Sequence, residues 1–286
     1  MSRVQSLQFV GQNGSAIELF YSEDFYIADI EGFSSLTADV ASSTTPSVDG
    51  DTVNMIQVQP RDIILTLLFK HGVDVEQAKR RILRTVKPKL KGKLRMLHDE
   101  RDVEIEGVVT SVTMPRFSNQ VAMQITLHCS IPYWQDAQFV AVELSRAIDK
   151  HYFPQDMGGL AFPVEGIVMG EYNLNMTHTY TNEGDVDCGM VITIIALGNV
   201  TNPTIYKSDG TFIGVDDTMV SGDQIVINTN KGQKSIVKNG ASIFSKVRAG
   251  SEFFSLDVGD NEITIDSDGG TEGNMYFTLS FKRRFV

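Results

Sequence analysis

Hydrophobic and polar residues alternate along much of the first half of the chain, a pattern that is typical of half-buried β-strands. In residues 121–129 the apolar side chains occupy every second position and end at Cys129, while His128 falls on the other face. Pro132 then removes a backbone donor and ends the strand before Trp134. Because neighbouring residues of a strand point to opposite sides, we predict that His128 and Cys129 do not form a nucleophile and its base.

A single helical pattern interrupts these strands. Asp74 is a suitable N-cap, Gln77 follows at the third helical position, and Pro88 ends the pattern. Between them the apolar residues recur at helical spacing, at Val75, Ala78, Ile82 and Val86. We therefore predict one helix packed against an antiparallel sheet of roughly seven strands.

Residues 34–51 differ in composition from the strands around them. This segment is rich in Ser, Thr, Ala and Asp, and it cannot bury enough apolar area to fold by itself. Long loops in compact domains are commonly functional, so we predict an arm that contacts a partner. The apolar residues available for that contact, in the segment or just after it, are Leu36, Val40, Val48 and Val53.

The second half shows many short strand patterns at close spacing, separated by hairpin turns such as "KSDGT" and "NTNKGQ". This arrangement predicts a β-sandwich. Residues 136–149 fit a short helix between the halves. We place an N-terminal domain at 1–145 and a C-terminal domain at 146–286, with the linker at about 146–165.

Charge is unevenly distributed along the 286 residues, whose formal net charge is −11. Residues 1–150 hold 16 basic and 19 acidic residues, whereas 151–286 hold 9 and 17, a balance of −8. An acidic second half argues against nucleic acid as its main ligand, because phosphate repels it. Two cysteines are too few for a disulfide framework, and the most apolar run, "DIILTLLF", is far too short to span a membrane.

Catalytic and metal-binding motifs are not evident. The histidines, at 71, 98, 128, 151 and 178, lack the spacing of a transition-metal site. Residues 266–274 resemble a calcium loop, but their glycines are misplaced, so a polar hairpin is the better interpretation. We predict no enzyme, no cofactor and no metal site, although carboxylates from different strands can still meet in space.

One basic segment stands out between Lys79 and Arg95, where nine basic residues occur without an acidic one. Interleaved aromatic residues, which would stack on bases, are missing from it. A solvated helix face or an acidic protein partner is therefore favoured over nucleic acid. The helix directs three of these cations away from its apolar face, namely Lys79, Arg80 and Arg84.

The order of these segments resembles the distal tail protein family of long-tailed bacteriophages. In the first half the matching marks are "DGDTVNMIQVQPRDIILTLLF", the single helix and the strand that ends in "CSIPYW", and "FP" then follows before the second domain. In the second half they are "TNEGDVDCGMVITIIALGNVTNPTIY", "VSGDQIVINTNKGQKSIVKNG" and "FSLDVGDNEITI". Together these marks cover most of the chain.

This resemblance implies a mainly β protein, with a β-barrel-like N-terminal domain that carries one α-helix and a galectin-like C-terminal β-sandwich. It implies six copies in a ring around the channel that DNA crosses, joining the tail tube to the adsorption apparatus or baseplate. The partners would be the tail tube protein and tail-tip or baseplate proteins, with no membrane and no sequence-specific nucleic acid. The protein would be part of the virion tail tip, assembled in the host cytoplasm.

Two other functions stay open at this point. The first is a carbohydrate-binding module for host recognition, which would need an exposed aromatic platform. The second half lacks tryptophan, so this platform would come from a phenylalanine or from Tyr172, Tyr180 or Tyr206. The second is a glycan-cleaving enzyme. We rank both below the structural role.

Overall fold

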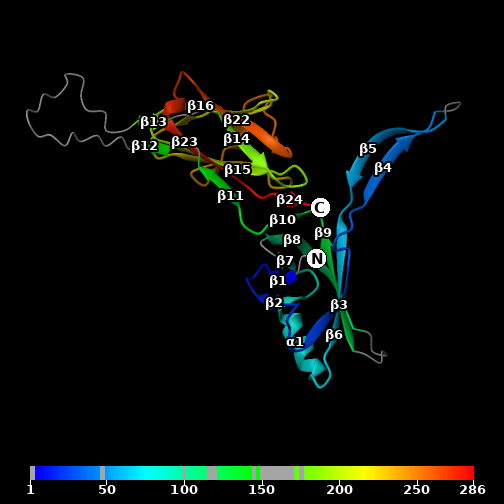
Figure 1. The fold of residues 1–286 in the computed structure, drawn as a ribbon. Helices are drawn as coiled ribbons and strands as arrows, with labels where there is room; N and C mark the ends of the chain where they lie inside the picture. Colours follow the sequence, from blue (N-terminus) through cyan, green and yellow to red (C-terminus); the bar gives the residue numbers. More distant parts are fainter. Residues whose placement is uncertain are drawn as a thin grey trace, which may run out of the picture. The chain divides into compact units, whose positions relative to one another are not determined.

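The computed structural model describes residues 4–45, 49–98, 101–114, 121–143, 146–148, 171–173 and 177–286. The chain divides into two compact units, one formed by residues 1–138 with 284–286 and the other by residues 139–283. Both are built mainly from β-strands, as the sequence predicts (Figure 1). Among the described residues, none of the helices is long and apolar enough to cross a membrane.

The first unit is built on one antiparallel sheet, in the order β2-β1-β7-β8-β9-β6-β3. Its strands are β1 (Val4–Gly11), β2 (Ala16–Glu18), β3 (Phe25–Glu31), β6 (Arg61–Phe69), β7 (Lys91–His98), β8 (Arg101–Thr113) and β9 (Ala122–Cys129). Beside this path, β10 (Trp134–Asp136) pairs with β8 and with β24 (Arg284–Phe285). The last strand of the chain therefore completes the first unit.

Helix α1 (Val75–Thr85) is the predicted helix, and it contacts β1 and β2. The Asp74 side chain accepts a hydrogen bond from the backbone N–H of Gln77, at 3.2 Å, which satisfies one free donor of the first turn. Ala78 and Ile82 are buried, so the predicted apolar face is the one that packs.

Alternating side chains build the core of the first unit. In β9 every second residue is buried, and in β6 the buried positions likewise alternate. The fully buried members include Leu7, Leu19, Ile63, Leu67, Leu94, Ile105 and Leu127. Each buried aliphatic side chain stabilises the fold by about 1.5–3 kcal/mol relative to its exposed state.

The predicted arm is more regular than its composition suggests. Instead of a loop, the chain forms an antiparallel hairpin of β4 (Ala38–Ser43) and β5 (Thr52–Val58). The backbone N–H of Gln59 donates to the carbonyl of Thr37, at 2.9 Å, at the base of this hairpin. Backbone hydrogen bonds do not require apolar residues, which is why composition alone did not reveal the strands.

The second unit is the predicted sandwich of two antiparallel sheets. One has the order β11-β23-β15-β19-β20-β21 and the other β14-β22-β16-β17, with β18 beside β16. The first comprises β11 (Val140–Glu143), β15 (Met190–Ala196), β19 (Gln224–Asn228), β20 (Ser235–Lys238), β21 (Ala241–Ser242) and β23 (Met275–Phe281). The second comprises β14 (Thr177–Asn182), β16 (Val200–Lys207), β17 (Phe212–Gly214), β18 (Thr218–Met219) and β22 (Gly259–Asp268).

Both sheets of the sandwich contribute to one hydrophobic core. Ile192, Ile227 and Leu279 come from one sheet, and Ile205 and Ile263 come from the other. The two predicted turns form the β16–β17 and β19–β20 hairpins. Three short pieces complete the unit: the 3-10 helices η1 (Phe244–Lys246) and η2 (Glu272–Asn274), and the pair of β12 (Arg146–Ile148) with β13 (Glu171–Asn173).

The predicted helix at 136–149 is wrong. This segment contains the end of β10, then β11 and β12, and β11 pairs with β23 inside the second unit. The pattern "FVAVE" also fits a strand, and hydrogen bonding to β23 selects that conformation. The division between the units falls after Gln138, and most of the predicted linker at 146–165 lies outside the described residues.

Candidate functional site

The β4–β5 hairpin exposes apolar side chains along most of its length. Val40 lies opposite Ile56, and after a bulge at Asn54 Ser42 lies opposite Val53. Val40, Val53 and Ile56 therefore share one face, while Met55 lies on the other. These four side chains are 50%, 51%, 66% and 57% exposed, respectively. Such a strip is typical of a surface that another molecule covers.

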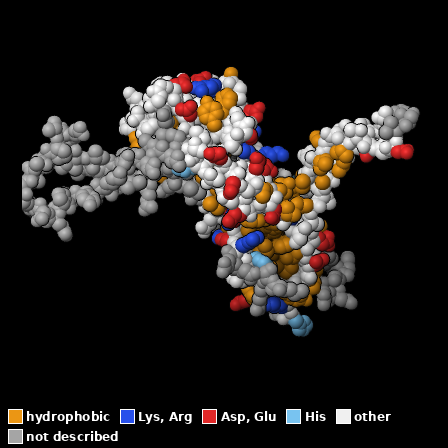
Figure 2. Space-filling model, turned by 45° about the horizontal axis from the view of Figure 1, so that its top comes forward, with side chains coloured by type: hydrophobic (Ala, Val, Ile, Leu, Met, Phe, Trp, Pro, Cys, Tyr) orange, Lys and Arg blue, Asp and Glu red, His pale blue; other side chains and the backbone are white. Residues whose placement is uncertain are grey.

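Of the predicted arm residues, Val40 and Val53 lie in this strip, Leu36 is half-buried beside the base, and Val48 lies outside the described residues. Sequence reasoning missed Met55 and Ile56, which carry more exposed surface. The signal that could have found them is the strand-like run "TVNMIQV", which follows directly after the predicted arm. Figure 2 shows hydrophobic side chains along the hairpin and acidic ones toward its tip.

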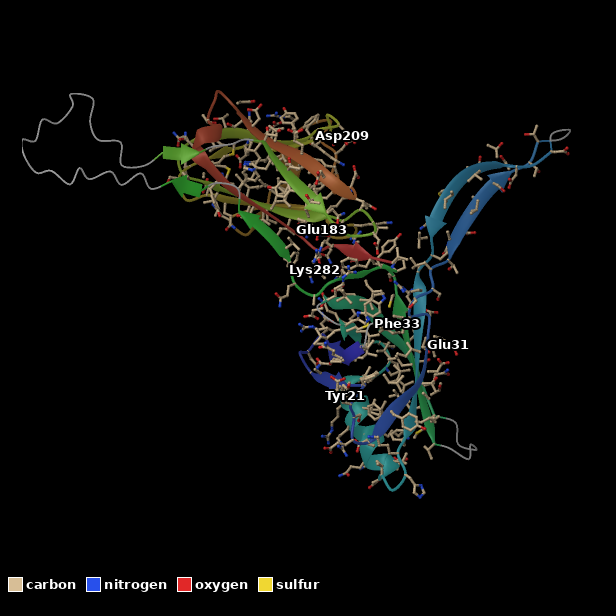
Figure 3. The ribbon with its side chains drawn as sticks, in the orientation of Figure 1. Tyr21, Glu31, Phe33, Glu183, Asp209 and Lys282 are labelled. Atoms are coloured by element: carbon tan, nitrogen blue, oxygen red, sulfur yellow. The ribbon has the colours of Figure 1, made fainter. Side chains whose placement is uncertain are left out.

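The base of the hairpin is held by partly buried polar contacts. The carbonyl of Phe33 accepts hydrogen bonds from Arg61 Nη1, at 2.8 Å, and from Trp134 Nε1, at 3.2 Å. The rings of Phe33 and Trp134 lie 4.9 Å apart, and Phe33 lies at the foot of the hairpin (Figure 3). Gly32 has a φ of +74°, and a Cβ there would collide with the carbonyl of Asp62. The chain therefore turns into the hairpin through a closely packed corner.

Arg61 is unusual because a guanidinium is rarely buried without a full set of acceptors. Its Nε and Nη2 have no hydrogen-bond partner in the described part of the chain. Burial lowers the pKa of Arg61 below its usual value, while its Nη1 donates to the carbonyl of Phe33. This side chain therefore ties the start of β6 to the base of the hairpin.

The basic segment between Lys79 and Arg95 has two different environments. On α1, Arg80 and Arg84 are exposed and have no ion pair among the described residues. Lys79 lies 3.7 Å from Glu76, and Arg81 lies 3.1 Å from Asp24. Of the three predicted docking cations, two are thus free for a partner and Lys79 is partly neutralised.

On β7 the cations are neutralised by acidic residues of β8. Lys93 lies 2.7 Å from Glu104 and 3.3 Å from Glu106, and Arg95 binds Asp102. Burial opposes the charge of Lys93, but its hydrogen bonds to the two glutamates prevail and raise its pKa. In the sequence these cations form one cluster with those of α1, because only the β7–β8 register brings in the carboxylates.

His128 and Cys129 lie on opposite faces of β9, as predicted. His128 Nδ1 lies 2.7 Å from the Asp62 carboxylate on the neighbouring strand, whereas Cys129 is fully buried. Burial raises the pKa of the Cys129 thiol to about 12, so the thiolate is not populated at neutral pH. His128 therefore makes a surface contact, whereas Cys129 belongs to the core.

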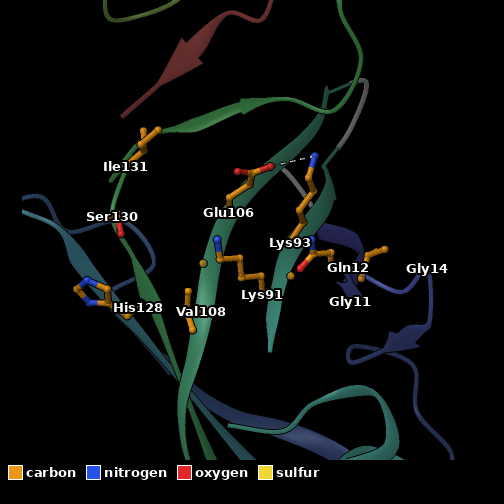
Figure 4. A pocket seen from close by; sticks show the side chains of 13 residues that line it. Gly11, Gln12, Gly14, Lys91, Lys93, Glu106, Val108, His128, Ser130 and Ile131 are labelled. Carbon is orange, nitrogen blue, oxygen red and sulfur yellow. Dashed lines mark ion pairs between the residues drawn. The ribbon is translucent and has the colours of Figure 1, made fainter. Parts of the chain in front are cut away.

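A hollow of about 530 Å³ lies on the outer face of the first unit's sheet (Figure 4). Lys91, Lys93 and Glu106 lie on one side of it, and Ser130 and Ile131 lie on the other. Val10, Val108 and His128 also line it.

The floor of this hollow is glycine backbone. Gly11 pairs with Gly92, and Gly92 pairs with Gly107, so three glycines lie side by side across β1, β7 and β8. A Cβ on Gly92 would collide with the Phe9 ring on the core side. Glycine in a strand allows a tight bend and a close approach of this kind.

The sandwich offers few aromatic residues for a sugar platform. Tyr180 is only 2% exposed, and burial raises the pKa of its hydroxyl above the ordinary value. Tyr206 is half-buried beside Phe212, and the side chain of Tyr172 lies outside the described residues. Phe244, 49% exposed, stacks on Phe253 at 5.7 Å. Within the described ranges, no group of three or more His, Cys, Asp or Glu residues is arranged to hold a metal ion.

Both halves of the chain match known protein families. Residues 12–129 match the phage tail protein RIFT-related domain, and residues 183–285 match the C-terminal domain of the siphovirus-type tail component. No curated protein matches the chain in sequence.

Solved structures share its fold over nearly the whole length. The SPP1 Dit (gp 19.1) protein, described as a paradigm of the hub adsorption apparatus in phages that infect Gram-positive bacteria, has a TM-score of 0.64 and 12% identity. A chain of the phage p2 baseplate in its activated conformation with calcium has a TM-score of 0.54 and 13% identity. Each match covers 98% of this chain and 99% of the other.

Proposed function

Because the chain belongs to the phage distal tail protein family, with a tail-component domain in each half, we propose that it forms a ring-shaped hub in the virion tail. The ring would contain six copies and would join the tail tube to the tail-tip or baseplate proteins. We expect it to assemble in the cytoplasm of the host cell. Its role is structural, and we expect no catalytic activity.

The observation that carries this proposal is the exposed β4–β5 hairpin. All six residues of β4 are exposed, and so are the first six of the seven in β5. A two-stranded hairpin is at best marginally stable in water, and four large exposed apolar side chains favour association. A ring in which each hairpin packs on a neighbouring copy would remove these side chains from water.

Native mass spectrometry of the full chain, with and without its tail partners, tests the ring. In one variant a short Gly-Ser turn replaces residues 38–58, because the contact between Thr37 and Gln59 then still closes the base. We expect hexamers from the unmodified chain and monomers from this variant. A full chain that stays monomeric even with its partners would contradict the ring.

A point variant makes the same test without shortening the chain. Replacing both Val40 and Ile56 by serine removes the centre of the apolar strip, and we expect it to shift the hexamer toward monomers. Val258→Ser is the matched control, because Val258 is 56% exposed but belongs to the second unit. If the control weakens assembly as much as the hairpin variant does, the hairpin is not the contact.

The runner-up function is sugar binding by the sandwich, and the burial of Tyr180 weighs against it. The exposed Phe244, stacked on Phe253, is the aromatic surface that a sugar would need. We expect no saturable binding of the full chain to host wall glycans in isothermal titration calorimetry. Micromolar binding that is lost in Phe244→Ala would reverse the order of the two functions.

A further inference from the structure

The hollow on the first unit's sheet and the β4–β5 hairpin have complementary surfaces. Residues 34–60 contain three aspartates and no Lys, Arg or His. Two of these aspartates lie near the hairpin tip, at Asp49 and Asp51, and all three are exposed. Between the acidic groups lie the exposed apolar residues of the strip. The hairpin is thus both acidic and apolar.

The hollow offers the opposite charge together with apolar walls. Lys91 is exposed and has no ion pair among the described residues, whereas Glu106 is already bound by Lys93. Val10, Val108 and Ile131 supply apolar surface, and Ile131 is 38% exposed. An occupant that combines carboxylates with aliphatic side chains would satisfy both features.

The glycine row explains why the hollow exists on this part of the sheet. Gly11, Gly92 and Gly107 have no side chains to hold the strands away from the core, and the ring of Phe9 occupies the position of the missing Cβ at Gly92. The backbone itself becomes the floor, so an incoming segment can approach it closely. A larger residue at Gly92 would require Phe9 to move.

We propose that the hollow of one copy receives the β4–β5 hairpin of a second copy. The proposal rests on the ring described above and identifies the surface that accepts the hairpin. A head-to-tail ring needs two different, complementary patches on every copy, and the first unit carries both. Aliphatic side chains of the hairpin would fill the hollow, while its aspartates approach Lys91.

Site-directed cross-linking tests the identity of the occupant. One preparation carries Val40→Cys and another carries Ile131→Cys, and the two are mixed under mild oxidation. The native Cys129 and Cys188 are buried and do not interfere. We expect a disulfide-linked pair of chains only in the mixture. The control mixes Val258→Cys with Ile131→Cys, and it should give no disulfide-linked pair.

A filled hollow provides the second test. Ser130 is exposed at the rim, so Ser130→Trp should fold normally and still prevent assembly. The control, Ser208→Trp, places the same side chain at an exposed position of the second unit.

A charge reversal provides the third test. Lys91→Glu should raise the protein concentration at which half of the chains are assembled by about tenfold. Lys87→Glu is the control, because Lys87 is exposed but lies outside the hollow, and it should leave that concentration unchanged.

The outcomes separate this proposal from the ring itself. If the unmodified chain forms rings, but Ser130→Trp does so equally well and no cross-link appears, the hollow is not the acceptor although the ring stands. If the unmodified chain does not assemble even with its partners, the ring fails and the proposal fails with it. A cross-link together with the loss of assembly in Ser130→Trp supports it.

Discussion

Two antiparallel hairpins of this protein have opposite surroundings. In the β19–β20 hairpin, Ile225, Ile227 and Ile236 are buried in the core of the sandwich. In the β4–β5 hairpin, side chains of similar size, such as Val40 and Ile56, are at least half exposed. The β19–β20 hairpin is therefore stabilised by packing within its own chain. The β4–β5 hairpin exposes apolar side chains that no other described residue of the chain covers.

The largest expected difference is in folding stability. We expect Ile227→Ala to lower the free energy of unfolding by about 2–5 kcal/mol, because it leaves a cavity in the core. Ile56→Ala in the monomer should change it by less than about 0.5 kcal/mol, because its side chain already contacts water. Urea unfolding at a concentration where the protein is monomeric measures both. A comparable loss for Ile56→Ala would mean that the hairpin packs within its own chain.

Acid should affect the two hairpins differently. Asp223, beside β19, accepts hydrogen bonds from the backbone of Val220 and from Asn239, and it lies 3.0 Å from Lys238. These contacts lower the pKa of Asp223 to about 2. A carboxylate whose folded pKa is depressed stabilises the fold above its unfolded pKa of about 4, and this stabilisation is lost as the pH falls toward 2.

The measurement is the urea midpoint at several pH values between 6 and 2. We expect Asp223→Asn to lower the midpoint at pH 6 and to reduce its further fall below pH 4. Asp39→Asn removes an exposed carboxylate of the other hairpin and serves as the control. An unchanged pH dependence in Asp223→Asn would show that this contact does not hold the β19–β20 hairpin.

The smallest expected effect on assembly concerns Arg80 and Arg84 of α1. Like the β4–β5 hairpin, these side chains are exposed. If exposure in the first unit marks contact surfaces, Arg80→Glu with Arg84→Glu should weaken assembly by about 0.2–1 kcal/mol per charge, and raised salt should weaken the unmodified assembly too. Lys79 is left unchanged because its reversal would repel Glu76. Sedimentation across a salt series measures this effect, and indifference to both changes would leave these cations as a solvated helix face.

The sequence predicted those parts of the fold that local pattern determines. The alternation in β9 and the cap at Asp74 gave a strand and a helix at the correct positions. The helix predicted over β11 failed because "FVAVE" fits both periods, and only the pairing with β23 decides between them. Strand β4 was missed because the segment around it is rich in Ala, Ser and Asp rather than in strand-forming residues, although its pairing with β5 holds it.

The candidate site was less predictable, because it depends on register. Lys93 and Glu104 are eleven residues apart, and only the β7–β8 pairing makes them partners. The hollow likewise needs three glycines from separate strands to lie in one row. Val40 and Val53 could be named from the sequence as apolar residues of the arm. The larger exposure of Ile56 follows only from the structure, in which the rest of the described chain does not cover the hairpin.

The pairing of β10 with β24 sets a time order on the first unit during synthesis. Trp134 of β10 lies opposite Phe285 of β24. Strand β10 is synthesised before most of the sandwich and β24 after it, so the two can pair only once the sandwich has been synthesised. At translation rates of about 5–20 residues per second, this interval is on the order of 10–30 s. The first unit is therefore complete only when the sandwich has been synthesised. A ribosome-bound chain thus offers other copies an unfinished first unit until β24 emerges.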